Sequence, residues 1–178
     1  PGIITRKHWT STGLYAAAGD IINIEVLADG KTKEGKYTDD LFAIINVHTD
    51  VLSANSGNVK KTGEIRRFPN VSSKTPLKLG KNMLRSQYGG QVIIYSARSL
   101  PTKVALVVDN VIEAPHFKLG RDTNADWQAI KAKPAPWGVL EGNGVYLDLP
   151  KSALAKITDP QGLLATFDQG IDMIHYLA

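Results

Sequence analysis

The run "LFAIINVHT" at residues 41–49 decides the fold class of this chain, because it is short, rich in Ile and Val, and ends in polar residues. Four further runs share these properties: "DIINIEVLA" (20–28), "QVIIYSA" (91–97), "KVALVVDNV" (103–111) and "GVYLDLP" (144–150). Gly, Pro, Asn or Asp bounds each run, which is typical of β-strands separated by turns. The spacings leave no room for crossover helices. The sequence therefore predicts a mainly β fold, an antiparallel β-sandwich of the jelly-roll kind, rather than a doubly wound α/β fold.

Two shorter segments add detail to this prediction. The glycines of "QYGGQ" at 87–91 predict a tight corner in which the backbone takes positive φ. The segment "DTNADWQAIKA" at 122–132 predicts a short surface helix with Trp127 and Ile130 facing inward.

The end of the chain predicts a longer helix. Asp159 can cap its first turn. Pro160 suits the first helical position, because the N–H that proline lacks would have no partner within the helix there. Apolar residues then recur at helical spacing: Leu163, Leu164, Phe167, Ile171, Ile174 and Leu177. Asp168 and Asp172 are expected on another face. No Gly or Pro closes the helix, so we expect a chain cut inside or just after it, whose bare apolar stripe folds back or self-associates.

The composition sets limits on function. The 178 residues include no Cys, which excludes disulfides, thiol nucleophiles and Cys-based zinc sites. The longest apolar runs, such as "VALVV" at 104–108, are too short to span a bilayer, and we expect no signal peptide in this chain. Because the chain opens at Pro1 without Met, we expect a processed or excised piece.

The net charge of +4 is unevenly distributed. Between residues 59 and 86, Glu64 is the only acidic residue among eight basic ones: Lys60, Lys61, Arg66, Arg67, Lys74, Lys78, Lys81 and Arg85. Few aromatic residues interleave with them, so a solvated face is favoured and no nucleic-acid partner is predicted.

No complete catalytic motif is present. The sequence contains no HExxH, no GxSxG and no phosphate-binding loop. His48 and Asp50 could form half of a metal site, although a strand end is favoured. His116 could pair with Glu113 across a bent strand, although a structural histidine is favoured. We therefore assign no catalytic residue and no metal ligand.

The stretch "PAPWGVLEG" at 134–142 predicts a shaped loop, because Pro and Gly punctuate it. Its Trp137 could be a wedge at one end of the sandwich, a brace against a further domain, or a platform for a sugar ring. In the last case Glu141 could accept hydrogen bonds from ring hydroxyls. Trp137 and Glu141 are therefore the candidate substrate-binding residues.

Seven motifs in order carry a resemblance to a known family: "WTSTGLYAAAGDIINIEV" (9–26), "NVHTDVLS" (46–53), "RRFPNVS" (66–72), "SQYGGQVIIY" (86–95), "IEAPHFKLG" (112–120), "APWGVLEGNGVYLDLP" (135–150) and "DPQGLLATFD" (159–168). Together they resemble the enhancin-like zinc metallopeptidases, the mucin-directed gluzincins. The resemblance covers almost the whole chain. It implies a β-sandwich front domain at 1–158, followed at 159–178 by the first helix of a truncated catalytic domain.

In that family the HExxH motif lies further along the chain. The resemblance therefore implies no cofactor in this chain, with zinc in the parent catalytic domain. It also implies secretion or surface display, and contacts with mucin-type glycoproteins and with the catalytic residues beyond Ala178. The expected function is a non-catalytic scaffold that could cradle the substrate. Two alternatives stay open: a freestanding carbohydrate-binding sandwich, and a metal enzyme that uses His48, Asp50 or His116.

Overall fold

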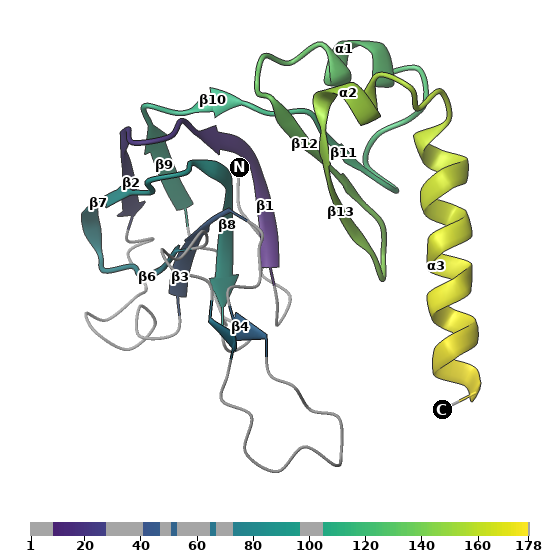
Figure 1. Cartoon of the computed structure of the whole chain (residues 1–178), viewed down its shortest axis with the longest axis horizontal. Coiled ribbons are helices and arrows are strands. Elements are labelled where there is room, and N and C mark those ends of the chain that lie inside the picture. Colours follow the sequence, from purple (N-terminus) through teal and green to yellow (C-terminus); the bar gives the residue numbers. More distant parts are fainter. Residues whose placement is uncertain are drawn as a thin grey trace. The chain divides into compact units, whose positions relative to one another are not determined.

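The computed structural model describes residues 9–27, 41–46, 51–52, 65–66, 73–96 and 105–177. The chain forms two compact units (Figure 1). The first comprises Pro1–Thr10 and Ala16–Asn110, and the second comprises Ser11–Tyr15 and Val111–Ala178. This grouping does not say where a catalytic domain begins, so the boundary expected between 158 and 159 stays a prediction.

The first unit is built from antiparallel strands. Its described strands are β2 (Ile21–Leu27), β3 (Leu41–Ile45), β4 (Val51–Leu52), β5 (Ile65–Arg66), β6 (Ser73–Pro76), β7 (Gly80–Arg85), β8 (Gly90–Ser96) and β9 (Ala105–Asp109). One sheet contains β8, β3 and β6 in that order, a second contains β7, β2 and β9, and β4 pairs with β5. The mainly β, antiparallel fold class is therefore confirmed.

Burial in this unit follows the period of two that the sequence shows. Ile22, Ile24 and Val26 alternate with more exposed residues along β2, so one face of its sheet is buried. The predicted corner before β8 is also confirmed, because Gly89 and Gly90 have φ of +67° and +136°. A Cβ atom on Gly89 would lie 2.4 Å from the carbonyl oxygen of Ala16, so this corner requires glycine.

The second unit contains a mixed sheet and three helices. It includes residues 11–15 of β1 (Trp9–Ala16), β10 (Ile112–Glu113), β11 (His116–Lys118), α1 (Trp127–Lys131), β12 (Trp137–Glu141), β13 (Tyr146–Pro150), α2 (Lys151–Leu154) and α3 (Pro160–Leu177). β11 and β12 run parallel, and β12 and β13 run antiparallel. The spacings were expected to leave no room for crossover helices, but α1, which lies in the predicted helical segment 122–132, is part of the connection between the parallel strands β11 and β12.

The core of this unit lies between the sheet and the helices. Its buried residues come from strands and helices alike: Phe117, Trp127, Leu140, Leu154 and Leu164. The rings of Phe117 and Trp127 meet edge to face, with centroids 5.9 Å apart. Trp127 also donates through Nε1 to the carbonyl of Ile157 at 2.8 Å. The inward positions predicted for Trp127 and Ile130 are confirmed, since Ile130 packs against the same core.

The stretch predicted as a loop is in part the central strand of this sheet. Residues 137–141 form β12, which pairs with β11 on one side and β13 on the other. Gly138 makes this close packing feasible, because a Cβ atom there would lie 2.6 Å from the Pro115 carbonyl oxygen and 2.8 Å from Leu154 Cδ1. The glycine that indicated a turn is therefore a site of close approach within a strand.

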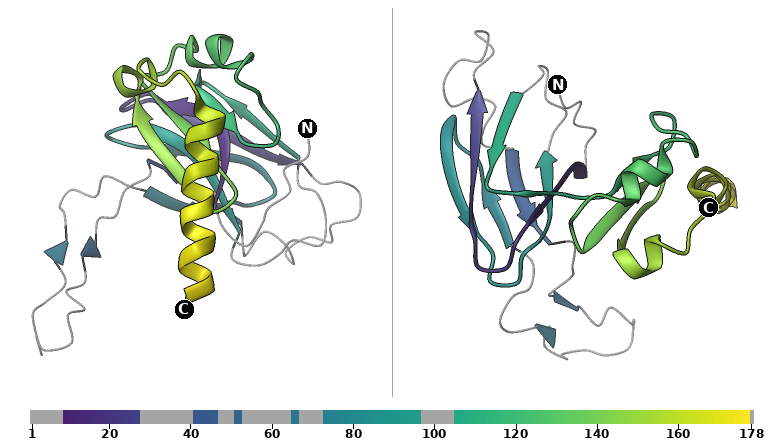
Figure 2. Two further views of the ribbon diagram at one scale, coloured as in Figure 1. Left: turned by 90° about the vertical axis from the view of Figure 1, so that its right-hand side faces the viewer. Right: turned by 90° about the horizontal axis from the view of Figure 1, so that it is seen from above.

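Helix α3 begins as predicted, with Asp159 Oδ1 accepting from the Gly162 amide at 2.8 Å. It runs alongside the sheet of β11, β12 and β13 (Figure 2). The expected placement of Asp168 on a polar face is wrong. Asp168 is 8% exposed and accepts from the backbone amides of Asn143 and Gly144, each at 2.8 Å. A carboxylate on the packed face is favourable here because the tight turn between β12 and β13 presents two amides to it.

Candidate functional site

The sheet of β11, β12 and β13 has one apolar and one largely polar face. Phe117, Leu140, Leu147 and Leu149 face the core and helices. Because side chains alternate along a strand, the opposite face carries the remaining residues. This polar face comprises His116, Lys118, Trp137, Val139, Glu141, Tyr146 and Asp148.

Both candidate substrate-binding residues belong to the polar face. Trp137 opens β12 and Glu141 closes it. At about 3.3 Å per residue their Cα atoms are roughly 13 Å apart. Trp137 is 40% exposed and lies opposite Pro150 of β13. The exposed indole is compatible with each of the three roles considered above, and these stay predictions.

Glu141 is held in an ion cluster on the polar face. Its Oε2 lies 2.8 Å from His116 Nε2, and its Oε1 contacts the Lys118 ammonium. Burial opposes ionisation of this carboxyl, but the hydrogen bonds from His116 and Lys118 outweigh it and lower the pKa of Glu141 to about 2. Glu141 is therefore an anion at physiological pH, and both of its oxygens already have protein partners.

The partner of His116 differs from the one suggested by the sequence. His116 pairs with Glu141, whereas Glu113 contacts Lys133. The parallel pairing of β11 with β12 sets His116 opposite Val139 and Lys118 opposite Glu141. This register brings together residues 25 positions apart, which local spacing does not show.

Residues 11–15 contact one end of the same face. A Cβ atom on Gly13 would lie 3.3 Å from His116 Nδ1, and the Gly13 carbonyl accepts from the Ala114 amide at 2.8 Å. Burial raises the pKa of Tyr146, and the charge of Asp148 adds to this effect, while a hydrogen bond with Ser11 opposes it. The hydroxyl of Tyr146 therefore stays protonated, as a neutral group beside carboxylates.

A second ion pair holds the end of β11. Arg121 Nη2 lies 2.6 Å from Asp122 Oδ2 and donates to the His116 carbonyl at 2.8 Å. Asp122 Oδ2 also accepts from the Lys118 amide at 2.8 Å. Burial opposes ionisation of Asp122, but the Arg121 and Lys118 hydrogen bonds outweigh it and lower its pKa. Four further residues of this face and its ion pairs were not predicted from the sequence: Lys118, Arg121, Asp122 and Tyr146. The only signal for them is the period-two spacing of polar residues at 116–118 and 146–148.

The remaining candidates lie elsewhere. His48 and Asp50 fall outside the described residues. Of the basic residues between 59 and 86, Lys74 places its ammonium over the rings of Phe42 and Tyr95, 4.4 and 4.1 Å from their centroids. Within the described ranges, no three His, Asp or Glu side chains come together as metal ligands, so this part of the chain does not fit zinc. No described helix is both long and apolar enough to cross a membrane.

Two protein-family profiles match the chain in tandem. The N-terminal domain of M60-like peptidases matches residues 4–108. The family of peptidase M60, enhancin and enhancin-like proteins matches residues 110–178. The two matches meet where the two compact units meet, apart from residues 11–15.

Individual proteins are similar over most of the chain. Human TRPM8 channel-associated factor 1 is 29% identical over 167 residues, which are 93% of this chain and 17% of that protein. Mouse TRPM8 channel-associated factor 2 is 27% identical over an alignment of 181 positions, which covers 97% of this chain and 18% of that protein. The chain therefore spans less than a fifth of the length of these curated relatives.

Solved structures share the fold. A conserved protein of unknown function from Bacillus anthracis str. Ames superposes with a TM-score of 0.70 at 22% identity, over 98% of this chain and 32% of that one. The ZmpB metallopeptidase from Clostridium perfringens superposes with a TM-score of 0.62 at 19% identity, over 93% of this chain and 35% of that one. The catalytic domain of Clostridium perfringens ZmpC, in complex with the sialyl T antigen, gives 0.63 at 16% identity, over 94% of this chain and 35% of that one.

Proposed function

Because the chain belongs to the M60-like, enhancin-like peptidase family, we propose that it is the non-catalytic N-terminal part of a zinc metallopeptidase acting on mucin-type glycoproteins. The observation that carries this proposal is the pair of tandem family matches over residues 4–108 and 110–178, in a sequence that contains no HExxH. Zinc and the general base would then come from the catalytic residues of the parent protein. Secretion or surface display is part of the proposal, since mucin-type glycoproteins lie outside cells.

The chain would serve this peptidase as a scaffold. Helix α3 buries Leu164 against the sheet but exposes apolar residues further along the helix: Phe167, Met173, Ile174 and Tyr176. Exposed apolar surface of this kind is typical of a contact with another folded part. We propose that this apolar surface of α3 packs against the catalytic part of the parent protein. Residues 159–178 would then form the first helix of the catalytic half.

The polar face would contribute to substrate binding. The exposed indole of Trp137 can stack on the apolar face of a sugar ring. Glu141 keeps its charge, and its carboxylate has lone pairs beyond those bonded to His116 and Lys118. It can therefore still accept a hydrogen bond from a sugar hydroxyl. The ZmpC structure in complex with the sialyl T antigen makes glycan binding a reasonable property to test in this family.

A fluorescence titration tests this role of Trp137. The chain would be titrated with a mucin-type O-glycopeptide, the free O-glycan and the unglycosylated peptide. We expect a saturable change with the glycopeptide that Trp137→Ala removes and that Trp9→Ala, at a similarly exposed indole, retains. An unchanged signal with a lower melting temperature for Trp137→Ala would instead make this residue a structural wedge. Equal binding of the free glycan would favour a freestanding carbohydrate-binding module.

The curated relatives support a second candidate function. Proteins named TRPM8 channel-associated factors are 25–29% identical to this chain, so it could belong to a protein that binds a membrane channel. Peptidase activity of the full-length protein on a mucin-type glycopeptide, removed by a zinc chelator and restored by zinc, would favour the peptidase. Folded full-length protein without such activity would favour the binding role.

A further inference from the structure

Helix α3 holds the turn that connects β12 and β13. Asn143 and Gly144 form the tip of this turn, and the Gly142 amide donates to the Val145 carbonyl at 2.9 Å across its base. The Asn143 amide donates to Asp168 Oδ2, and the Gly144 amide donates to Asp168 Oδ1, each at 2.8 Å. Because Asp168 is only 8% exposed, little water competes for its oxygens. Two charge-assisted hydrogen bonds therefore tie the tip of the turn to α3.

The turn is also packed closely against α3. A Cβ atom on Gly142 would lie 2.7 Å from Asp168 Oδ1, and one on Gly144 would lie 3.0 Å from Ile171 Cγ2. An Asn-Gly pair in a two-residue hairpin usually takes positive φ at both positions. Neither Asn143 nor Gly144 has positive φ here. The pair therefore lies against α3 in a conformation other than the one that its sequence favours.

An Asn-Gly pair is also chemically reactive. Asn143 is the only Asn that Gly follows in this sequence, and it is exposed. Glycine has no side chain to block the approach of its nitrogen to the preceding side chain. When the Gly144 nitrogen loses its proton and attacks Asn143 Cγ, an N–Cγ bond forms, the Cγ–Nδ2 bond breaks, and Nδ2 leaves as ammonia. Water then opens the cyclic imide at either carbonyl, which leaves Asp or isoaspartate at this position.

Asp168 opposes the first step of this reaction. The nitrogen that would attack is the one that donates to Asp168 Oδ1, so it must give up that hydrogen bond before it can reach Cγ. It must also become anionic beside a carboxylate, which a like charge disfavours. We propose that Asn143 is a deamidation site, and that Asp168 protects it for as long as α3 stays packed on the turn.

Deamidation would in turn weaken the contact with α3. A carboxylate at position 143 adds a negative charge to a turn that already binds the Asp168 carboxylate, and the two charges repel. Isoaspartate also adds a carbon to the backbone between the two amides, so they no longer fit the two oxygens of Asp168. Because the loss of ammonia to water is irreversible, a chain that has reacted keeps the weakened contact.

The rate of deamidation at Asn143 tests this proposal. Folded chain would be incubated in mildly alkaline buffer, and peptide mapping by mass spectrometry would follow the conversion at this position. We expect Asp168→Ala to react about tenfold faster or more, because it removes two charge-assisted hydrogen bonds. Asp172→Ala removes an exposed carboxylate of the same helix and should keep the wild-type rate.

A general loss of stability could also expose the turn, so Gly138→Ala serves as a second control. This substitution disturbs packing at the other end of β12 and should accelerate the reaction much less than Asp168→Ala. Equal acceleration by the two variants would overturn the proposal, and so would equal rates for Asp168→Ala and wild type. A slower reaction in Asp168→Ala would overturn it as well, because the carboxylate would then act as a base that assists the attack.

Asp168→Asn replaces the alanine variant if that variant fails to fold. It keeps the shape of the side chain but loses the charge and one acceptor oxygen, so we expect reaction at Asn143 at least about threefold faster than in wild type. An unchanged rate would refute the protection by Asp168. Peptide mapping separates this reaction from any at the new amide. None of these results depends on the peptidase proposal.

Discussion

At the scale of single residues, Glu141 couples stability to pH. Its pKa falls from an ordinary 4.5 to about 2 in the folded chain. A carboxyl with a lowered folded pKa contributes stability that is complete above the unfolded pKa and is lost as the pH falls towards the folded one. The window for Glu141 is therefore from pH 4.5 down to about 2.

We expect Glu141→Gln to lower the free energy of unfolding at pH 7 by about 1–3 kcal/mol, because the neutral amide leaves His116 and Lys118 without their charged partner. The difference from wild type should shrink as the pH falls through the same window. Urea unfolding at a series of pH values measures both effects. Asp172→Asn, at an exposed position of α3, is the control and should change neither. A constant difference at all pH values would contradict this role.

A second residue has an unusual environment. Gln91 is 1% exposed, and neither amide atom has a hydrogen-bond partner among the described residues. Such a group costs about 1–3 kcal/mol of desolvation. We therefore expect Gln91→Leu to raise the free energy of unfolding by about 1 kcal/mol or more, whereas Gln169→Leu on the exposed side of α3 should change it by less than about 0.5 kcal/mol. Thermal unfolding of both variants measures this, and a loss of stability would show that the Gln91 amide bonds in solution.

At the scale of elements, two glycines predict opposite effects of the same substitution. A Cβ atom built on Gly138 would lie within 3 Å of atoms of Pro115 and Leu154. Gly138→Ala should therefore destabilise the chain by about 1–3 kcal/mol through overpacking between β12 and its neighbours. Gly170 of α3 has open space around it, so Gly170→Ala should stabilise the helix by about 0.5–1 kcal/mol. Denaturant midpoints of the two variants should move in opposite directions; a shift of the same sign would contradict this packing.

Helix α3 also shows what an element's pattern predicts and what it leaves open. Its start at Asp159 and Pro160 is encoded locally by a cap and an N1 proline, and this was predicted. The packed face was not, because it includes Asp168 beside Leu164. From the sequence alone, a carboxylate in a helix is expected to be exposed to solvent. Only the fold shows that the turn amides of Asn143 and Gly144 donate to Asp168.

At the scale of the whole molecule, the exposed half of α3 predicts self-association. Ile174 is 63% exposed and Met173 is 64% exposed. We expect the isolated chain to associate increasingly with concentration, and Ile174→Lys to reduce this because it adds a charge to the apolar surface. Ser152→Lys adds the same charge at an exposed position of α2, outside this helix, and should reduce it less. Sedimentation velocity over a range of concentrations measures the effect, and a monomer at every concentration would refute it.

The sequence by itself determined the strands that its five apolar runs mark, β2, β3, β8, β9 and β13, and the limits on chemistry. Ile22, Ile24 and Val26 alternate with polar residues, and this period holds wherever one face of a sheet is buried. Trp127 and Ile130 likewise predicted the inner side of α1. These features depend on residues close together in the chain, so hydrophobic periodicity and capping are sufficient to show them.

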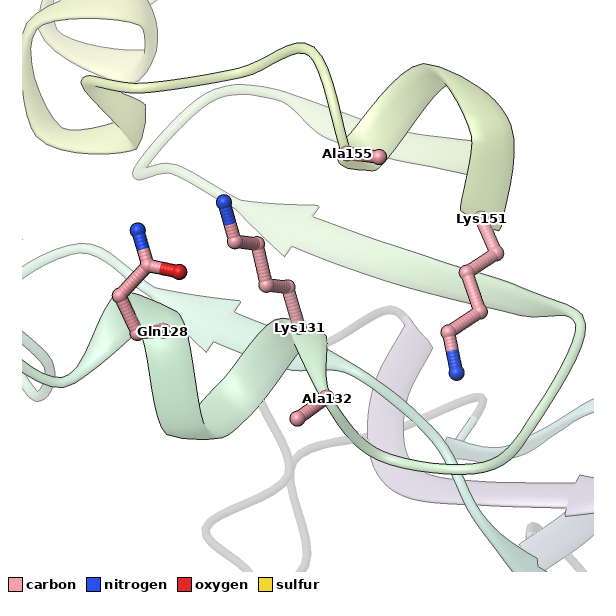
Figure 3. A pocket seen from close by; sticks show the side chains of 5 residues that line it. All are labelled: Gln128, Lys131, Ala132, Lys151 and Ala155. Atoms are coloured by element: carbon pink, nitrogen blue, oxygen red, sulfur yellow. The ribbon is translucent and has the colours of Figure 1, made fainter.

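Only the tertiary structure decided which distant residues meet. His116 pairs with Glu141 because β11 and β12 run parallel in one register, and Gly138 lies inside a strand because Pro115 and Leu154 approach it. Residues of α1 and α2 line one open pocket, although β12 and β13 separate these two short helices in the sequence (Figure 3). Register and packing depend on the free energy of the whole core, whereas periodicity and capping depend on a few neighbouring residues.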